Sequence, residues 1–165
     1  MSPLVAQLIL SVGTMAGQHE NAYVYLNCAD QQTGVTLESC DELTVSFDYS
    51  EVMIGDIGSV VHDSHPDANY FVVHSPLLSI AIPRNGYSDK DQWTFRGLEF
   101  RKIKKQFSPR ILGVALSVDV VTVSKGGKPQ MTFWYSKQAG VQALSFGPND
   151  VYYCAEARCL FDNKP

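Results

Sequence analysis

The stretch VVTVSKGGKPQMTFWYS, residues 120–136, decides the fold class of this chain. Residues that favour strands stand on both sides of Gly126-Gly127, and a glycine pair can adopt the positive φ angles of a tight hairpin turn. Strand alternation places four apolar residues on one face: Val121, Val123, Met131 and Phe133. The stretch therefore predicts a β-hairpin with one buried face.

The flanking segments continue this pattern. The turn SKQAG, residues 136–140, leads into GVQALSF, residues 140–146, so the hairpin extends to a three-strand meander. Other segments rich in β-branched and aromatic residues alternate with turn clusters such as PRNGYSD and GPND. In QWTFRGLEFRKI the apolar alternation shifts at Gly97, which predicts a β-bulge or a tight bend there.

The whole chain has the character of one globular domain. Its 165 residues are about the length of one domain. A composition of 45% hydrophobic and 18% charged residues excludes an intrinsically disordered protein. No convincing helical apolar period follows the first eighteen residues. We expect an all-β protein in which residues 17–165 form a single domain, an antiparallel β-sandwich or barrel of roughly eight strands, after an N-terminal leader.

The leader is predicted from residues 1–16. They carry no charged side chain, and the nine apolar-rich residues LVAQLILSV precede the small residues Thr14 and Ala16, which is typical of a signal peptide cleaved after Ala16. The run is too short for a membrane span, which needs about 20 residues. A core strand or helix is the competing interpretation, because Lys and Arg are absent from the leader. We expect a secreted or periplasmic protein.

Four cysteines point to the same compartment. They allow three connectivities, and the economical one has two local disulfides, Cys28–Cys40 and Cys154–Cys159. A zinc site is the alternative, but structural zinc pairs usually have two to four intervening residues, whereas eleven separate the first pair here. We therefore favour disulfides.

Charge is unevenly distributed along the chain. Residues 1–83 have a net charge of −10 and contain no Lys or Arg, whereas residues 84–165 have a net charge of +6. The simpler explanation, which we favour, is that acidic strands lie beside basic strands and pair with them. The alternative is a molecule with two oppositely charged faces, one of which steers a charged partner.

Three of the four histidines lie close together in the sequence, in HDSHP (residues 62–66) and at His74. If SVVH and NYFVVH form a hairpin around the loop DSHPDA, then His74 lies roughly 16 Å from His62, too far to share a metal. A divalent-metal site of His62, His65 and Asp67 remains as a hypothesis. The more usual case is a surface loop with unliganded histidines, and we expect no other cofactor.

A basic stretch, RGLEFRKIKKQFSPR, spans residues 96–110. Cations interleaved with aromatic residues suit nucleic acid, but the acidic, exported chain argues against such a partner. Cations on both faces of a strand protect a sheet edge, so we expect an edge strand here, with contact to an anionic partner as the second interpretation. Exposed aromatic residues would anchor a protein interface. The candidate partner-binding residues are Arg96, Arg101, Lys102, Lys104, Lys105, Trp134 and Tyr135.

No catalytic motif stands out. GDIGS, residues 55–59, lacks the serine of the trypsin-like turn, and nucleophile elbows, zinc-protease helices and phosphate-binding loops are absent from the sequence. We therefore expect a non-enzymatic exported binding protein, of the inhibitor or immunity type, that blocks a protein partner with loops on a disulfide-linked β scaffold. The alternatives are a small-ligand or metal-binding β-barrel and, third, a hydrolase without a recognisable motif. Oligomeric state does not follow from the sequence.

Overall fold

The computed structural model describes residues 22–28, 40–47, 49–62, 67–107, 110–111, 114–115, 117–148, 150–155 and 159–162. Within them the chain is all-β with one short 3-10 turn, η2 (Tyr87–Asp89), and they contain no helix long and apolar enough to cross a membrane. The expected leader, residues 1–16, lies outside the described residues. The strands are β1 (Ala22–Cys28), β2 (Cys40–Ser46), β3 (Glu51–Ile54), β4 (Ile57–Val60), β5 (Tyr70–His74), β6 (Ser79–Pro83), β7 (Gln92–Phe95), β8 (Leu98–Phe107), β9 (Arg110–Ile111), β10 (Val114–Ala115), β11 (Val118–Lys125), β12 (Lys128–Ser136), β13 (Gly140–Gly147) and β14 (Asp150–Cys154).

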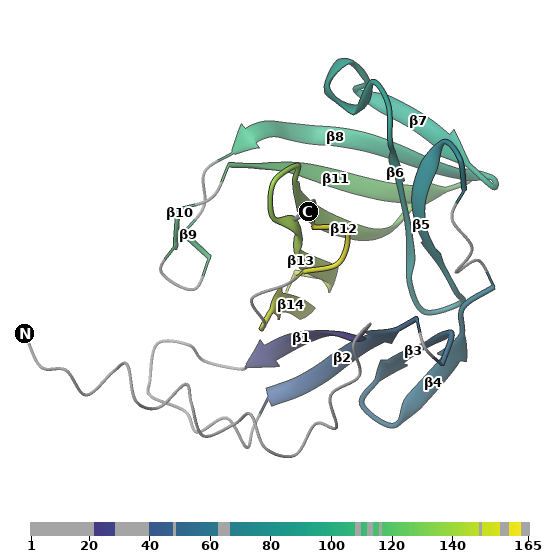
Figure 1. The fold of residues 1–165 in the computed structure, drawn as a ribbon, viewed down its shortest axis with the longest axis vertical. Helices are drawn as coiled ribbons and strands as arrows, with labels where there is room; N and C mark the ends of the chain where they lie inside the picture. The colour runs from purple at the N-terminus through teal and green to yellow at the C-terminus, as the bar shows by residue number, and fades with distance from the viewer. Residues whose placement is uncertain are drawn as a thin grey trace, which may run out of the picture.

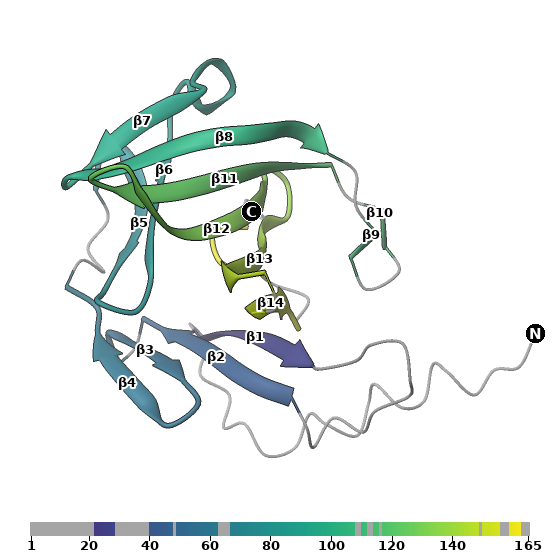
Figure 2. The ribbon, with the colours of Figure 1, turned by 180° about the vertical axis from the view of Figure 1, so that it is seen from behind.

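Ten of these strands form one antiparallel sheet in the order β4-β3-β2-β1-β14-β13-β12-β11-β8-β7. Strand β1 pairs with β14, so the N-terminal and C-terminal halves meet along a single ladder. The sheet curls around the core, and the separate hairpin β5–β6 stands at the side between its two ends (Figures 1 and 2). A two-residue pair of strands, β9 and β10, completes the described fold.

The sheet is open, which corrects the expected sandwich or barrel of roughly eight strands. Its terminal strands β4 and β7 do not pair with each other, and the hairpin β5–β6 contacts both ends instead. The backbone N–H of His62, just after β4, donates to the carbonyl oxygen of His74 at 2.9 Å. Trp93 on β7 donates from Nε1 to the carbonyl oxygen of Ala81 on β6 at 2.7 Å. The hairpin thus fills the gap that direct pairing would close in a barrel.

The hairpin expected at residues 120–136 is confirmed. Gly126 and Gly127 have φ angles of 55° and 74°, and β11 and β12 pair on either side of them. Two cross-strand pairs, Val121 with Phe133 and Val123 with Met131, supply the buried face. Strand β13 follows β12 in the sheet, so the meander is confirmed as well.

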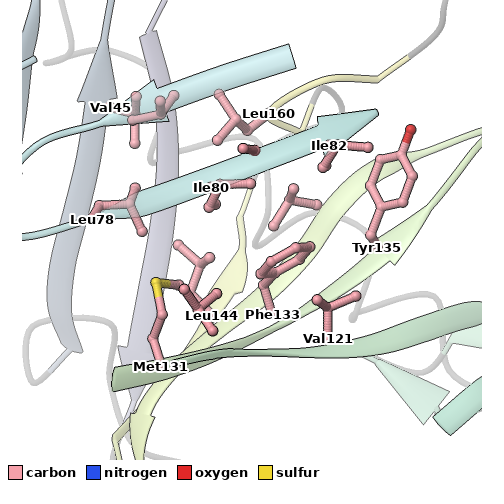
Figure 3. Packing of buried hydrophobic residues seen from close by; sticks show 14 of the residues in the cluster. Val45, Leu78, Ile80, Ile82, Val121, Met131, Phe133, Tyr135, Leu144 and Leu160 are labelled. Atoms are coloured by element: carbon pink, nitrogen blue, oxygen red, sulfur yellow. The ribbon is translucent and has the colours of Figure 1, made fainter. Parts of the chain in front are cut away.

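The core lies between the concave face of the sheet and the hairpin β5–β6. Leu78, Ile80 and Ile82, before and within β6, face the side chains of Phe133 and Leu144 from the sheet (Figure 3). Full burial of such a side chain contributes about 1.5–3 kcal/mol. Because side chains fill the inside of the curve, the hollow barrel that a small-ligand carrier needs is not present in the described part of the chain.

Strand β8 is covered by β7 only as far as Lys102, and beyond this residue no strand of the described part of the chain pairs with that side of β8, so the expected edge is present at residues 103–107. The sequence change at Gly97 is a tight turn rather than a bulge: Arg96 and Gly97, with φ angles of 49° and 76°, connect β7 to β8. The short strand β7 therefore folds back along β8 and takes the outer position. Lys102 lies two positions after the buried Phe100 on β8, so it shares the inner face of the sheet and its side chain is buried.

Both expected disulfides are present. Cys28–Cys40 joins two directly opposed residues of β1 and β2, and Cys154–Cys159 ties the end of β14 to the C-terminal segment. No cysteine is free, so the four do not form a zinc site. Two disulfides are typical of an extracellular or periplasmic environment, which does not reduce them.

Candidate functional site

The strand order converts the charge asymmetry of the sequence into a spatial one. Strands β4, β3, β2 and β1 form one end of the sheet, and all precede residue 84, before which the chain has no Lys or Arg. Among the described residues, both ion pairs, Lys102–Asp119 and Lys105–Asp91, join residues of the second half. The expectation that acidic and basic strands pair with each other was therefore wrong. Within the ten-stranded sheet, β1 to β4 pair with one another and meet the remaining strands through the ladder of β1 with β14, so one end is acidic and the other basic.

Three of the four large hydrophobic residues that are exposed in the described part of the chain lie at the acidic end. Tyr49, Ile57 and Val60 are each 64% exposed. The fourth exposed large hydrophobic residue of the described part of the chain is Ile103, 54% exposed, which lies on β8 near the other end of the sheet. Ile57 and Val60 belong to β4, the terminal strand of the sheet, which contains no charged residue. Edge strands are usually protected by charges or proline because their open backbone invites pairing. Strand β4 lacks this protection.

The backbone of β4 presents hydrogen-bonding groups to the outside. The N–H of Val61 donates to the carbonyl oxygen of Ser50 at 2.7 Å, so this residue directs its polar groups toward β3. In an antiparallel ladder the direction alternates along the strand, and Ser59 and Ile57 therefore also face β3. Gly58 and Val60 direct their N–H and C=O groups away from the sheet. Directly after β4 this side is covered, because the N–H of His62 donates to the carbonyl oxygen of His74 on β5, so the open part of the edge is β4 itself, with which no further strand of the described residues pairs.

Carboxylates surround the exposed strand. Glu51 stands opposite Val60 on β3, and a Cβ built on Gly58 would lie 2.6 Å from Oε1 of Glu51, so this carboxylate lies over the strand. Asp56 lies in the turn between β3 and β4, and the N–H of Gly55 donates to the carbonyl oxygen of Glu42, which brings the turn close to β2. We define the acidic edge as β4 (Ile57–Val60) together with Tyr49, Glu51, Asp56 and Glu42.

A second cluster surrounds the buried Lys102 at the basic end. Its side chain is 1% exposed, and its Nζ atom pairs with Oδ2 of Asp119 at 3.5 Å. The same Nζ atom donates to the carbonyl oxygen of Tyr87 at 2.5 Å and lies 3.8 Å from the centroid of the Tyr87 ring. Burial lowers the pKa of Lys102, and Asp119 opposes this shift. The ring of Tyr87 also packs edge-on against Tyr135 at 5.0 Å, and burial raises the pKa of Tyr135 to about 12.

An open cleft of about 430 Å³ lies beside this cluster, with Lys102, Lys105 and Tyr135 in its lining. Its cations already have partners: Lys102 pairs with Asp119, Lys105 pairs with Asp91 at 2.6 Å, and Lys137 donates to Ser88. The lining includes serines but no histidine that could activate them as nucleophiles. These contacts connect η2 to β8, β11 and β12, and we assign the cluster a structural role.

The other predicted partner-binding residues do not gather at this cleft. Arg96 lies in the turn between β7 and β8, with its guanidinium carbon 5.6 Å from the ring centroid of Phe95. Arg101 and Lys104 are exposed on β8, and Trp134 is half-buried on β12. Tyr135 and Lys102 are buried, so neither is a surface anchor. Two of the seven predicted residues are therefore buried, and a binding role of the other five stays a prediction.

The histidine loop differs from the expected hairpin. Strand β4 pairs with β3, and β5 pairs with β6, so His62 and His74 are joined through their backbones rather than separated. Oδ1 of Asp67 accepts hydrogen bonds from the N–H groups of Asn69 and Tyr70 at 2.7 and 3.2 Å, so this carboxylate caps the start of β5. His65 lies outside the described residues, which contain no group of three metal-ligating side chains. The proposed metal site stays a prediction.

No protein-family model, curated protein or solved structure matches this chain. The surface features of the molecule are therefore the basis for inferring its function, and the acidic edge is a stronger candidate for a binding site than the cleft beside Lys102. The sequence did contain a local signal for the acidic edge, because Gly55-Asp56 separates the strand-forming runs EVMI and IGSV. It could not show that IGSV is the last strand of the sheet, because that depends on pairings elsewhere.

Proposed function

We propose that the protein is an exported, non-enzymatic binding protein that blocks another protein, as an inhibitor or immunity protein does, and that it binds through the acidic edge. One observation carries the proposal: three of the four large exposed hydrophobic residues in the described part of the chain lie on or next to β4. Ile57 and Val60 lie on opposite faces of this one edge strand, so a partner that binds along the edge covers both side chains.

The energetics favour a protein partner. Burial of Ile57 and Val60 against a partner would contribute about 1.5–3 kcal/mol for each side chain. The strand beneath them is already held in place, because Val52 on β3 and Val45 on β2 are fully buried in the core. A surface that is ordered before binding loses little conformational entropy on association, so more of the contact energy appears as affinity.

The two disulfides support a role outside the reducing cytoplasm. Cys28–Cys40 links β1 to β2 within the acidic end of the sheet. In the chain-entropy model a disulfide closing a loop of this size stabilises the fold by about 3 kcal/mol. Such a link preserves the geometry of the acidic edge in an extracellular or periplasmic setting, where an inhibitor of a secreted protein would act.

The test compares two variants that add positive charge at exposed apolar residues. The first is the double variant Ile57→Lys, Val60→Lys in the acidic edge, and the matched control is Ile103→Lys on β8. Each protein is immobilised and exposed to an extracellular and periplasmic extract of the source organism. We expect one stoichiometric protein to be retained by the wild type and the control and to be lost from the double variant. A partner retained equally by all three, or no stoichiometric partner at all, would exclude the proposal.

A further inference from the structure

Resting on this proposed function, we infer that the partner contributes an extended, basic segment that adds to β4 as an eleventh strand of the ten-stranded sheet. Three independent features of the acidic edge lead to this mode of binding: the direction of its backbone groups, the alternation of its side chains and the sign of its charge.

The backbone supplies the first reason. Gly58 and Val60 direct their N–H and C=O groups outward, so β4 offers donors and acceptors in the spacing of a strand. A peptide that lies along this edge satisfies them without any rearrangement of β3. Strand addition of this kind takes its affinity from main-chain hydrogen bonds and its specificity from alternate side chains.

The side chains supply the second reason. Ile57 and Ser59 share a face with the buried Val52, whereas Gly58 and Val60 share the opposite face with Glu51. An added strand places its own residues alternately on these two faces. Its residues on the first face meet Ile57 and are expected to be apolar. Its residues on the second face meet the carboxylate of Glu51 and are expected to be Lys or Arg.

Charge supplies the third reason. The strands from β1 to β4 contain Asp41, Glu42 and Glu51 and no Lys or Arg, and Asp56 lies at the turn next to the edge. This concentration of one sign attracts a cationic segment during encounter and disfavours an acidic one. A basic strand with alternating apolar residues is therefore the occupant that fits both the two faces of β4 and the negative charge around it.

A peptide experiment tests the chemistry of the occupant. The probe is a capped peptide of about eight alternating Lys and Val residues, a common strand length. The matched control replaces each Lys with Glu. Calorimetric titration of the full chain should show binding of the Lys–Val peptide that weakens as salt is raised, and at least about tenfold weaker binding of the Glu–Val peptide, a difference of about 1.4 kcal/mol. Equal binding of both peptides, or binding of neither, would overturn the inference.

A proline variant tests the backbone pairing. Val60→Pro removes an N–H that points outward, so the ladder with β3 stays intact, and proline is tolerated at such edge positions. Val60→Ala is the matched control, because it shortens the side chain and keeps the N–H. We expect Val60→Pro to bind the Lys–Val peptide at least about tenfold more weakly than Val60→Ala. Equal affinities of the two variants would show that the segment does not add as a strand.

These outcomes separate the inference from the proposed function. If the captured partner is lost from the Ile57→Lys, Val60→Lys variant but bound equally by Val60→Pro and Val60→Ala, the acidic edge binds protein by side-chain contacts alone. Light scattering of the chain over a range of concentrations tests whether a second copy of the chain, rather than a basic partner, occupies the acidic edge. We expect no association of the chain with itself; assembly that Val60→Pro abolishes would assign the edge to a second copy and overturn the basic partner.

Discussion

The hydroxyl oxygen of Tyr25 accepts a hydrogen bond from the backbone N–H of Leu160 at 3.1 Å, across 135 positions of sequence. The same hydroxyl donates to the carbonyl oxygen of Val141 at 2.9 Å, and the N–H of Val141 donates to the carbonyl oxygen of Leu160 at 2.8 Å. One buried side chain on β1 thus connects β13 to the C-terminal segment held by Cys154–Cys159.

Tyr25→Phe should therefore destabilise the protein although the ring is retained. The substitution leaves the N–H of Leu160 and the carbonyl oxygen of Val141 each with one hydrogen bond fewer inside the core. An unsatisfied buried group costs about 1–3 kcal/mol, and we expect the free energy of unfolding to fall by about that amount. Urea unfolding with the disulfides intact measures it. A loss below about 0.5 kcal/mol, the range of an ordinary surface substitution, would contradict this role for the hydroxyl.

Gly140 makes the approach of the C-terminal segment to β13 possible. Its φ angle is +76°, and a Cβ at this position would lie 2.5 Å from the carbonyl oxygen of Leu160. Gly127 is the matched control, because its φ angle is +74° and no atom lies within 4 Å of its Cβ position. We expect Gly127→Ala to cost about 1–2 kcal/mol for the left-handed backbone alone. Gly140→Ala should cost about 1–3 kcal/mol more for the steric clash, and equal costs would mean that the segment is easily displaced.

Alkaline pH should unfold the protein. Burial raises the pKa of Tyr25 and Tyr87 strongly and that of Tyr135 to about 12. Below the unfolded tyrosine pKa of about 10 both states keep these protons; above it the unfolded state releases them and the folded state does not, so the free energy of unfolding falls as pH rises. For Tyr135 this loss extends from about pH 10 to about pH 12.

Near-ultraviolet absorbance of tyrosinate measures this effect. The four buried tyrosines, Tyr25, Tyr87, Tyr135 and Tyr152, should ionise only as circular dichroism reports unfolding, because burial raises the pKa of each hydroxyl. A single ionisation step of all eight tyrosines with the fold retained would contradict the burial of these hydroxyls.

The sequence predicted those features that depend on neighbouring residues. The hairpin at Gly126 and Gly127 requires only strand-forming residues around a turn, and the disulfides join cysteines that are close in sequence. The shift at Gly97 was also recognisable, and of the two predicted alternatives, a bulge or a tight bend, the tight bend is confirmed.

The errors have a common physical origin in long-range pairing. Whether a strand is an edge depends on every other ladder in its sheet, so the sequence could not show that β7 covers the first part of β8 and leaves the part with Lys104 and Lys105 open. In the same way, the pattern before and after the histidine loop allowed a hairpin, but β4 pairs backward with β3 and β5 pairs forward with β6. The exposure of Ile57 and Val60, on which the candidate site rests, follows from these same distant pairings.

Lys102 illustrates how such a pairing changes the role of a residue, and its role can be tested by a double-mutant cycle. Lys102→Met keeps the length of the side chain but leaves the carbonyl oxygen of Tyr87 without its donor and the carboxylate of Asp119 without its cation. Breaking a fully buried pair costs about 3–5 kcal/mol; because Asp119 is 17% exposed, we expect about 2–3 kcal/mol. Asp119→Asn in the Lys102→Met background should recover part of this loss, since no unpaired carboxylate remains. Strictly additive effects in urea unfolding would show that the two charges do not interact, and that Lys102 is held by Tyr87 alone.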